Sequence, residues 1–348
     1  MDSNLQPVPA GPAVVTPSPP GPPPVDRGAA GSPAGTPVVQ LDGVTVIYGK
    51  NQALKNVSAR FERGAVGLLG PNGAGKSTML KALLGFVKPN VGRMHVLGLD
   101  VAHRPMEIRA RLGYMPETDG HIPGMNAVSF VAYCGQLAGL PAVDAMQRAH
   151  EVLYYVGLGE ARYRNLETYS TGMKQRIKLA QAIVHDPDLL FLDEPTNGMD
   201  PKGRDEMLEL IRDLGHNKGV SLILSSHLLP DVEYTCDHVV VMDKGQVAAQ
   251  GPIAELKGPA GRVFELRVKV ATGSLPGFID VLQKAGMECH STDEDVMRVF
   301  VPTGVGGSER TDQQILFSLA AKEGVQVRHL RPSVPTLEDV FAKAVGEE

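Results

Sequence analysis

One stretch constrains the fold of this chain more than any other: Gly70-Pro71-Asn72-Gly73-Ala74-Gly75-Lys76-Ser77-Thr78. It follows an apolar run, 65–69, that is typical of a buried strand, and it precedes 79–85, which favours a helix ended by glycine. A GxxxxGK[ST] match between a strand and a helix predicts a phosphate-binding loop rather than an inert turn. The glycines let several N–H groups point at one anion beside a helix N-terminus. Lys76 is then expected to reach the β- and γ-phosphates, and the Ser77 hydroxyl to bind Mg²⁺.

Length and composition allow about two domains in 348 residues, with 43% hydrophobic residues for a core. The net charge of -5 shows no basic excess that would favour a nucleic-acid partner. Three widely spaced cysteines, Cys134, Cys236 and Cys289, fit reduced thiols in a cytosolic protein. No apolar run approaches the roughly 18 residues that span a bilayer, and we expect no secretory signal.

Residues 1–36 are dominated by Pro, Gly, Ala and Ser, and eleven of the 27 prolines occur at or before Pro37. Such a segment buries too little apolar surface to offset its ordering entropy. We therefore predict a disordered tail, either passive or used as a docking site by a proline-binding partner.

Two further strands end in side chains that suit phosphate chemistry. Residues 188–192 carry four apolar residues in succession, as in a parallel strand buried on both faces, and Asp193 and Glu194 follow them. Ligands of doubly wound sheets bind at this end of the strands. Asp193 suits the Mg²⁺ shell, and Glu194 is placed to polarise an attacking water. Residues 220–226 form another buried strand, and His227 is expected to emerge at the same sheet edge.

The remaining segments up to residue 258 complete an ordered pattern. Residues 38–48 and 52–61 favour a β-hairpin, in which Tyr48 could stack on a base or be an ordinary half-buried strand residue. Residues 122–168 have helical spacing and indicate a small helical insertion, and Ser170 is a good N-cap for a helix to Val184. The other predicted elements are segments 92–97 and 108–115, a loop at 116–120, a helix at 202–214, a hairpin around Asp243-Lys244 and a helix at 251–257.

Residues 262–331 are predicted to form a module separate from the preceding segments. Their predicted order, βαββαβ, resembles a ferredoxin-like module, and without concentrated chemistry an interaction role is expected. A last helix is predicted at 336–345.

Five motifs then occur in the order of an ABC transporter ATP-binding subunit, which the chain resembles over roughly residues 38–258. They are Gly70–Thr78, Tyr169–Arg176, Asp193–Pro195, Asn197–Asp200 and Ser226–His227. The closing segment 335–341 resembles the tail of the type-two exporter branch, where the membrane channel is a separate protein.

The resemblance implies an α/β fold: a P-loop NTPase (RecA-like) core with an antiparallel β-subdomain and a helical insertion, plus a small α+β C-terminal domain. The expected domains are a Pro/Gly/Ala-rich tail at 1–36, an ATP-binding domain at 37–258 with its insertion at about 119–184, and a ferredoxin-like accessory domain at 259–348.

The resemblance implies a role for each residue of this chain that matches a family motif. Tyr48 matches the aromatic that stacks on adenine, Glu194 the catalytic base, and His227 the histidine that senses the γ-phosphate. Ser77 and Asp193 match the magnesium ligands. In this family Asn197–Asp200 touches the other ATPase subunit, and the signature at Ser170, Thr171, Gly172 and Met173 completes the partner's ATP site.

Three positions depart from the family pattern, two in the signature and one at the sensor position. Thr171 and Met173 replace a glycine and a glutamine of the signature, although Ser170 and Gly172 keep the hydroxyl and backbone donors. The sensor position that is commonly Gln is Glu117, whose carboxylate could bind the metal through water but lacks the usual hydrogen-bond donor.

The implied function is an ATP-binding and ATP-hydrolysing subunit that drives an exporter with a separate permease. The implied cofactors are ATP and Mg²⁺. The expected partners are an integral membrane permease and a second ATP-binding subunit, with no nucleic acid, at the inner face of the cell membrane. Two alternatives are a soluble ATPase acting on nucleic acid or ribosomes, which usually has two cassettes or a coiled-coil insertion, and a non-hydrolysing regulatory module, which Lys76, Glu194 and His227 together disfavour.

Overall fold

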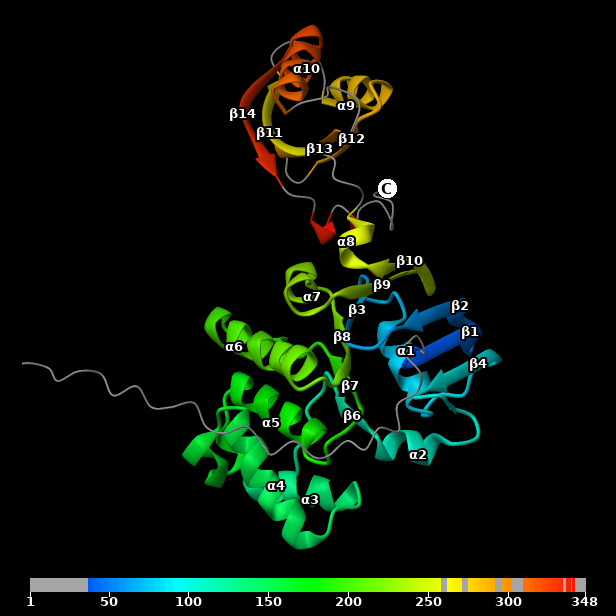
Figure 1. The fold of residues 1–348 in the computed structure, drawn as a ribbon, viewed down its shortest axis with the longest axis vertical. Coiled ribbons are helices and arrows are strands. Elements are labelled where there is room, and N and C mark those ends of the chain that lie inside the picture. The colour runs from blue at the N-terminus through cyan, green and yellow to red at the C-terminus, as the bar shows by residue number, and fades with distance from the viewer. Residues whose placement is uncertain are drawn as a thin grey trace, which may run out of the picture. The chain divides into compact units, whose positions relative to one another are not determined.

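A computed structural model describes residues 37–257, 262–270, 275–291, 296–301, 309–333, 336–338 and 340–341 (Figure 1). The predicted tail at 1–36 lies outside the described residues. The strands are β1 Val39–Tyr48, β2 Asn51–Phe61, β3 Ala65–Leu69, β4 Val91–Val96, β5 Leu99–Asp100, β6 Leu112–Met115, β7 Leu189–Asp193, β8 Ser221–Ser226, β9 His238–Asp243, β10 Gln246–Pro252, β11 Arg262–Val270, β12 Glu288–Ser291, β13 Val296–Val301 and β14 Val325–Ser333. The helices are α1 Lys76–Leu83, α2 Pro105–Ala110, α3 Ala127–Leu137, α4 Ala142–Tyr155, α5 Thr171–Ile183, α6 Pro201–Arg212, α7 Leu229–Thr235, α8 Ile253–Leu256, α9 Leu275–Lys284 and α10 Glu309–Lys322, with short 3-10 helices η1 Gly159–Tyr163 and η2 Leu166–Thr168 and a π-helical segment η3 Asp213–Asn217.

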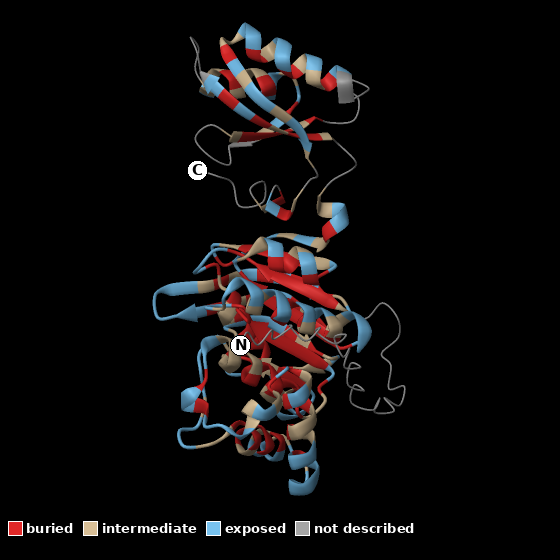
Figure 2. Cartoon of the chain, turned by 90° about the vertical axis from the view of Figure 1, so that its left-hand side faces the viewer, coloured by how far each residue is buried: buried red, intermediate tan, exposed pale blue. Residues whose placement is uncertain are grey.

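The main sheet is mostly parallel, and the candidate functional side chains lie at the ends of its strands. Its order is β10-β9-β3-β8-β7-β6, and only the β9–β10 hairpin is antiparallel. Alternate residues of β7 enter two different cores: Leu190 and Leu192 enter one, and Leu189 and Phe191 the other. Strands β3, β7 and β8 are buried along their whole length, among the strands coloured red in Figure 2, which confirms the prediction made from their continuous apolar runs.

An antiparallel sheet of order β2-β1-β4-β5 packs against one of those cores. The predicted hairpin is present, since β1 and β2 pair from Val39↔Phe61 to Tyr48↔Asn51. Helix α1 contributes Met79, Leu80 and Leu83 to the same core. The phosphate-loop helix is thereby held between two sheets.

Helices α3, α4 and α5 form the predicted helical insertion on the other side of the main sheet (Figure 1). Side chains cap two of them: Asn126 accepts a hydrogen bond from Ser129 N, and Ser170 from Met173 N. The predicted N-cap at Ser170 is therefore confirmed.

The C-terminal region has the predicted βαββαβ order and forms an antiparallel sheet, β12-β13-β11-β14. It has a core of its own, which includes Phe264, Phe278, Met297 and Leu316. This core shares no residue with the other two, so we propose that α9, α10 and β11–β14 form a separate domain. Leu337 and Val340, which the predicted domain 259–348 includes, belong instead to the core that holds Leu190 and Leu192.

Several element boundaries differ from the sequence prediction. Helix α1 begins at Lys76 rather than Met79, so the last residues of the glycine-rich stretch form its first turn. Segment 108–115 divides between the end of α2 and strand β6. The short helix predicted at 251–257 spans only Ile253–Leu256, because β10 pairs with β9 as far as Pro252. Of the predicted last helix, the described residues 337, 338, 340 and 341 are helical. Among the described residues no helix is long and apolar enough to span a bilayer.

Helix α5 packs so closely on β6 that it requires a glycine there. A Cβ placed on Gly113 would lie 2.1 Å from the Ala182 carbonyl oxygen, which is backbone and cannot rotate away. We expect Gly113→Ala to destabilise the protein by about 3 kcal/mol, through overpacking. Urea unfolding of the purified chain measures the change in midpoint.

Gly120→Ala is the matched control, because a Cβ there has no described atom within 4 Å. Its effect should stay within about 0.5 kcal/mol. An unchanged midpoint for Gly113→Ala would contradict the close packing of α5 on β6.

Candidate functional site

The glycine-rich loop between β3 and α1 forms an anion cradle. Gly70, Gly73 and Gly75 all have positive φ, and a Cβ on Gly75 would lie 2.8 Å from the Ala53 carbonyl oxygen. Gly75 is the N-cap of α1 and makes no side-chain cap, so the first N–H groups of the helix face the loop without a helical partner. The Lys76 ammonium reaches back over the loop and donates to the Gly70 carbonyl at 2.6 Å. The loop therefore offers backbone donors and one cation to the same anion.

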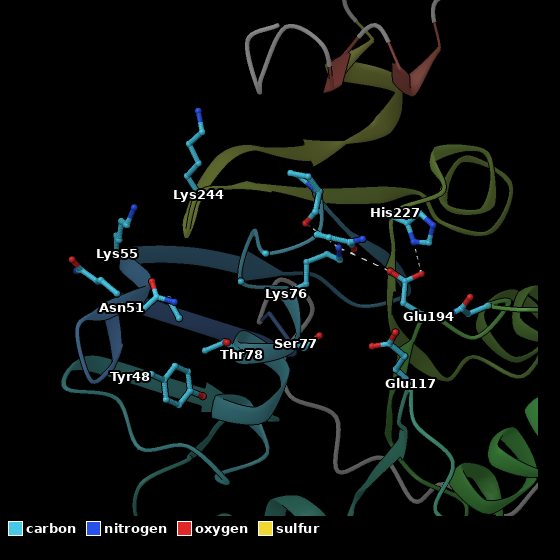
Figure 3. Close-up of a pocket in the computed structure, with 17 residues that line it drawn as sticks. Tyr48, Asn51, Lys55, Lys76, Ser77, Thr78, Glu117, Glu194, His227 and Lys244 are labelled. Carbon is cyan, nitrogen blue, oxygen red and sulfur yellow. Dashed lines mark hydrogen bonds and ion pairs between the residues drawn. The ribbon is translucent and has the colours of Figure 1, made fainter. Parts of the chain in front are cut away.

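Strand β7 ends at Asp193, and Glu194 follows it at the edge of the sheet beside that loop. Figure 3 shows Glu194 among the residues that line the cavity. Glu194 sits at φ 49° immediately after the strand, in a left-handed conformation that turns its side chain into the cavity. One of its oxygens lies 2.9 Å from His227 Nδ1, and the other lies 4.0 Å from Lys76 Nζ. The expectation that His227 emerges at the same edge as Asp193 and Glu194 is thus met in the structure.

Burial shifts the pKa values of Glu194 and Lys76 in opposite directions. Burial raises the pKa of Glu194, and the neighbouring His227 and Lys76 oppose the shift. Burial lowers the pKa of Lys76, while Glu194, Asp193 and Glu117 oppose it. A carboxyl group with a raised pKa is a better proton acceptor, so Glu194 fits a general base.

Asp193 lies deeper, with 3% of its surface exposed. Burial raises its pKa, and the nearby Ser225 hydroxyl and Lys76 oppose the shift. Asp193 Oδ1 has no hydrogen-bond partner among the described residues. A buried carboxylate oxygen left without a donor, next to the Ser77 hydroxyl, fits the oxygen ligands that Mg²⁺ prefers.

A cavity of about 610 Å³ collects most of the predicted site. Its lining includes these residues from the prediction: Tyr48, Pro71, Asn72, Gly73, Gly75, Lys76, Ser77, Thr78, Glu117, Glu194 and His227. Gly70 and Ala74 are buried in the loop behind the cavity. Tyr48 lies at the opposite end of the cavity from Glu194 in Figure 3 and is 46% exposed, so a base could reach its ring. Its stacking role stays a prediction.

Sequence reasoning missed part of this lining. Asn51, Gln52, Ala53, Lys55 and Lys244 come from the β1–β2 and β9–β10 hairpins. No motif marks them, since β2 and β10 approach the loop only through the fold. The signal that could have found Lys55 is its position on the hairpin that turns beside Tyr48, whereas Lys244 lies in the turn of the other hairpin and has no such signal.

The four signature residues lie outside the cavity. None of Ser170, Thr171, Gly172 and Met173 lines the cavity, and Ser170 and Thr171 are exposed at the start of α5. This is the arrangement expected if they serve the ATP site of another subunit.

Comparison with known proteins agrees with the arrangement of this site. The ABC transporter family model matches residues 54–197. An uncharacterized ABC transporter ATP-binding protein, YxlF of Bacillus subtilis, is 34% identical over 310 residues, which are 88% of this chain and 99% of the relative. The daunorubicin/doxorubicin resistance ATP-binding protein DrrA of Streptomyces peucetius is 32% identical over 89% of this chain and 93% of its own length. The solved structure of CbiO1 from Clostridium perfringens, part of the ABC transporter complex CbiONQ, matches with a TM-score of 0.57 and 27% identity, over 62% of this chain and 89% of that one.

Proposed function

Because this chain belongs to the family of ABC transporter ATP-binding subunits, we propose that it is the ATPase of an exporter whose membrane channel is a separate permease. The observation that carries the proposal is the convergence of Lys76, Glu194 and His227 on one cavity that also holds the phosphate loop. Isothermal titration calorimetry with Mg²⁺ and ATP tests it on the purified chain. Absence of binding by folded protein would overturn it.

The chain's own side chains divide the chemistry between binding and proton transfer. The loop N–H groups and Lys76 bind the β- and γ-phosphates of the substrate ATP, and Tyr48 stacks on adenine. Glu194 accepts the proton of the attacking water, and His227, 2.9 Å away, holds the carboxylate and faces the γ-phosphate. Phosphoryl transfer needs mainly positioning and charge stabilisation, which this arrangement supplies.

Ser77 and Asp193 would hold Mg²⁺, and Glu117 would reach it through water. The fit rests on the unpartnered Asp193 oxygen and on the lining hydroxyl of Ser77. When bound, the ion would neutralise charge on the β- and γ-phosphate oxygens.

The complete site needs two subunits. The chain carries one copy of each motif, and Ser170 and its neighbours lie outside their own chain's cavity. We propose a homodimer in which Ser170 and Gly172 of each subunit complete the ATP site of the other.

Mixing two inactive variants tests this arrangement. Ser170→Ala and Lys76→Ala should each lose most of their ATPase activity as pure proteins. A mixture should recover roughly a quarter of wild-type activity, because about half of the dimers are mixed and each mixed dimer keeps one complete site. Steady-state phosphate release measures the recovery. A mixture no more active than its components would contradict shared sites.

The permease is proposed to dock on the helical insertion, where large apolar side chains are exposed. Leu137 and Val143 are 71% and 79% exposed, and Met146 and Tyr154 lie on the same helix as Val143. Such a contact would place the chain at the inner face of the cell membrane. Co-expression with the permease tests it: the chain should then be found in the membrane fraction, and without the permease it should not.

A further inference from the structure

Two buried polar side chains lie on one face of α5, three residues apart. Gln175 is 5% exposed, and its amide donates to the Asn197 carbonyl oxygen at 2.9 Å. Lys178 is 1% exposed, and its ammonium donates to the Glu117 carbonyl oxygen at 2.8 Å. Asn197 and Glu117 both line the nucleotide cavity. One helix therefore holds the backbone of two segments at the edge of the site.

The contact of Lys178 with the loop that follows β6 is charged as well as hydrogen-bonded. Its ammonium lies 3.5 Å from one oxygen of Asp119, and Lys174 lies 3.7 Å from the other. Burial lowers the pKa of Lys178, whereas Asp119, Glu117 and Asp193 oppose that shift. A buried ammonium without such partners would be strongly unfavourable, so the loop and the lysine stabilise each other.

The far end of the same loop also contacts the helical insertion. The His121 ring packs edge-on against Phe130 of α3, with ring centroids 5.5 Å apart. Segment 117–121 is thus fastened to α5 at one end and to α3 at the other. Its position follows the helical insertion as well as the strand β6 from which it emerges.

We propose that Lys178 is a positioning residue: from α5, it fixes the backbone of Glu117 and so sets the Glu117 carboxylate at the edge of the nucleotide cavity. The inference rests on the function proposed above. Helix α5 begins next to Ser170, about 12 Å from Lys178 along its axis. A displacement of the Ser170 end by a partner subunit is therefore transmitted to Glu117 through a single rigid helix.

Lys178 could also act on the site through its charge alone, and that role predicts an effect on the site opposite to the effect of the positioning contact. Removing a cation near Asp193 and Glu117 would by itself strengthen the binding of Mg²⁺. Loss of the positioning contact would weaken catalysis, because a small displacement of a site group lowers the rate steeply. The sign of the effect therefore distinguishes the two roles.

Lys178→Met removes the ammonium and keeps the volume of the side chain. In the nucleotide-free full-length chain, amide hydrogen exchange of segment 116–122 should become at least roughly tenfold faster. The kcat for ATP should fall roughly tenfold, while the dissociation constant for ATP without Mg²⁺ stays within about twofold. Lys202→Met is the control, because Lys202 is an exposed lysine on α6 whose ammonium lies 3.9 Å from Glu206; it should change each quantity by less than about twofold.

A double-mutant cycle decides whether Lys178 acts through Glu117. If it does, Lys178→Met combined with Glu117→Ala should be no slower than Glu117→Ala alone, within about twofold, because alanine leaves no side chain for Lys178 to position. Full additivity of the two effects, or unchanged exchange of segment 116–122, would overturn the proposal. If Lys178→Met does not fold, Lys178→Leu, which also removes the donor to the Glu117 carbonyl oxygen, takes its place in the cycle. Wild-type chain that binds no ATP would refute the proposed function instead, and the nucleotide-free exchange would still test Lys178.

Discussion

Replacing Glu194 by glutamine should abolish turnover while leaving the nucleotide bound. Glutamine keeps the size of the side chain and its place beside His227 and Lys76, but its amide cannot accept the proton of the attacking water. Loss of a general base lowers kcat by roughly a thousandfold. If ATP binds between two subunits as proposed, ATP should shift the variant from monomer to dimer and keep it there, because the variant still binds the nucleotide. Phosphate release and size-exclusion chromatography with ATP and Mg²⁺ measure the two effects.

Stability provides an internal check on this variant. The pKa of Glu194 is raised by burial, so the ionised carboxylate is disfavoured there and a neutral amide should fold at least as well. Glu209→Gln on the exposed face of α6 is the control and should leave turnover unchanged. Wild-type turnover by Glu194→Gln would remove Glu194 as the base and would direct attention to another proton acceptor in the cavity.

Lys76→Ala should remove nucleotide binding as well as activity. The ammonium supplies the one cation that lies within the phosphate loop, and its bond to the Gly70 carbonyl, at 2.6 Å, holds it over the cradle. Charge-assisted contacts with phosphate oxygens weaken binding by roughly a hundredfold or more when they are lost. Calorimetry with ATP and Mg²⁺ measures the change in the dissociation constant.

The matched control for that variant is Lys81→Ala, an exposed lysine on the same helix. It should bind ATP as the wild type does, within about twofold. If Lys76→Ala bound ATP normally, the glycine-rich loop would not be the phosphate site, and the proposed function would lose its main support.

Much of the site could be predicted because its signals are local. The positions of Gly70, Gly73 and Gly75 specify a loop that only positive φ allows, and the apolar runs before Lys76 and Asp193 specify strands buried on both faces. Each of these features depends on residues within a few positions in the chain. The helical insertion and the C-terminal βαββαβ order were predicted for the same reason, whereas the α/β fold class was implied by the resemblance to ABC transporter ATP-binding subunits.

Contacts between residues that are far apart in the chain could not be predicted from such local signals. The strand pattern predicted that His227 and Glu194 share a sheet edge, but it did not predict their contact, which joins residues 33 positions apart. The contact of Lys178 with Glu117 joins residues 61 positions apart and was not predicted at all. Lys178 occupies an ordinary helical position in the sequence, and its periodicity says only that it is on a helix.

The sequence by itself determined where the chain turns, where it forms strands and which residues can bind phosphate, because backbone preferences and hydrophobic periodicity act over a few residues. Only the tertiary structure decided which of those residues meet. The side chains that line the cavity come from parallel strands, a hairpin and a helix that approach one another when the two cores close, and that closure depends on packing between segments far apart in the chain.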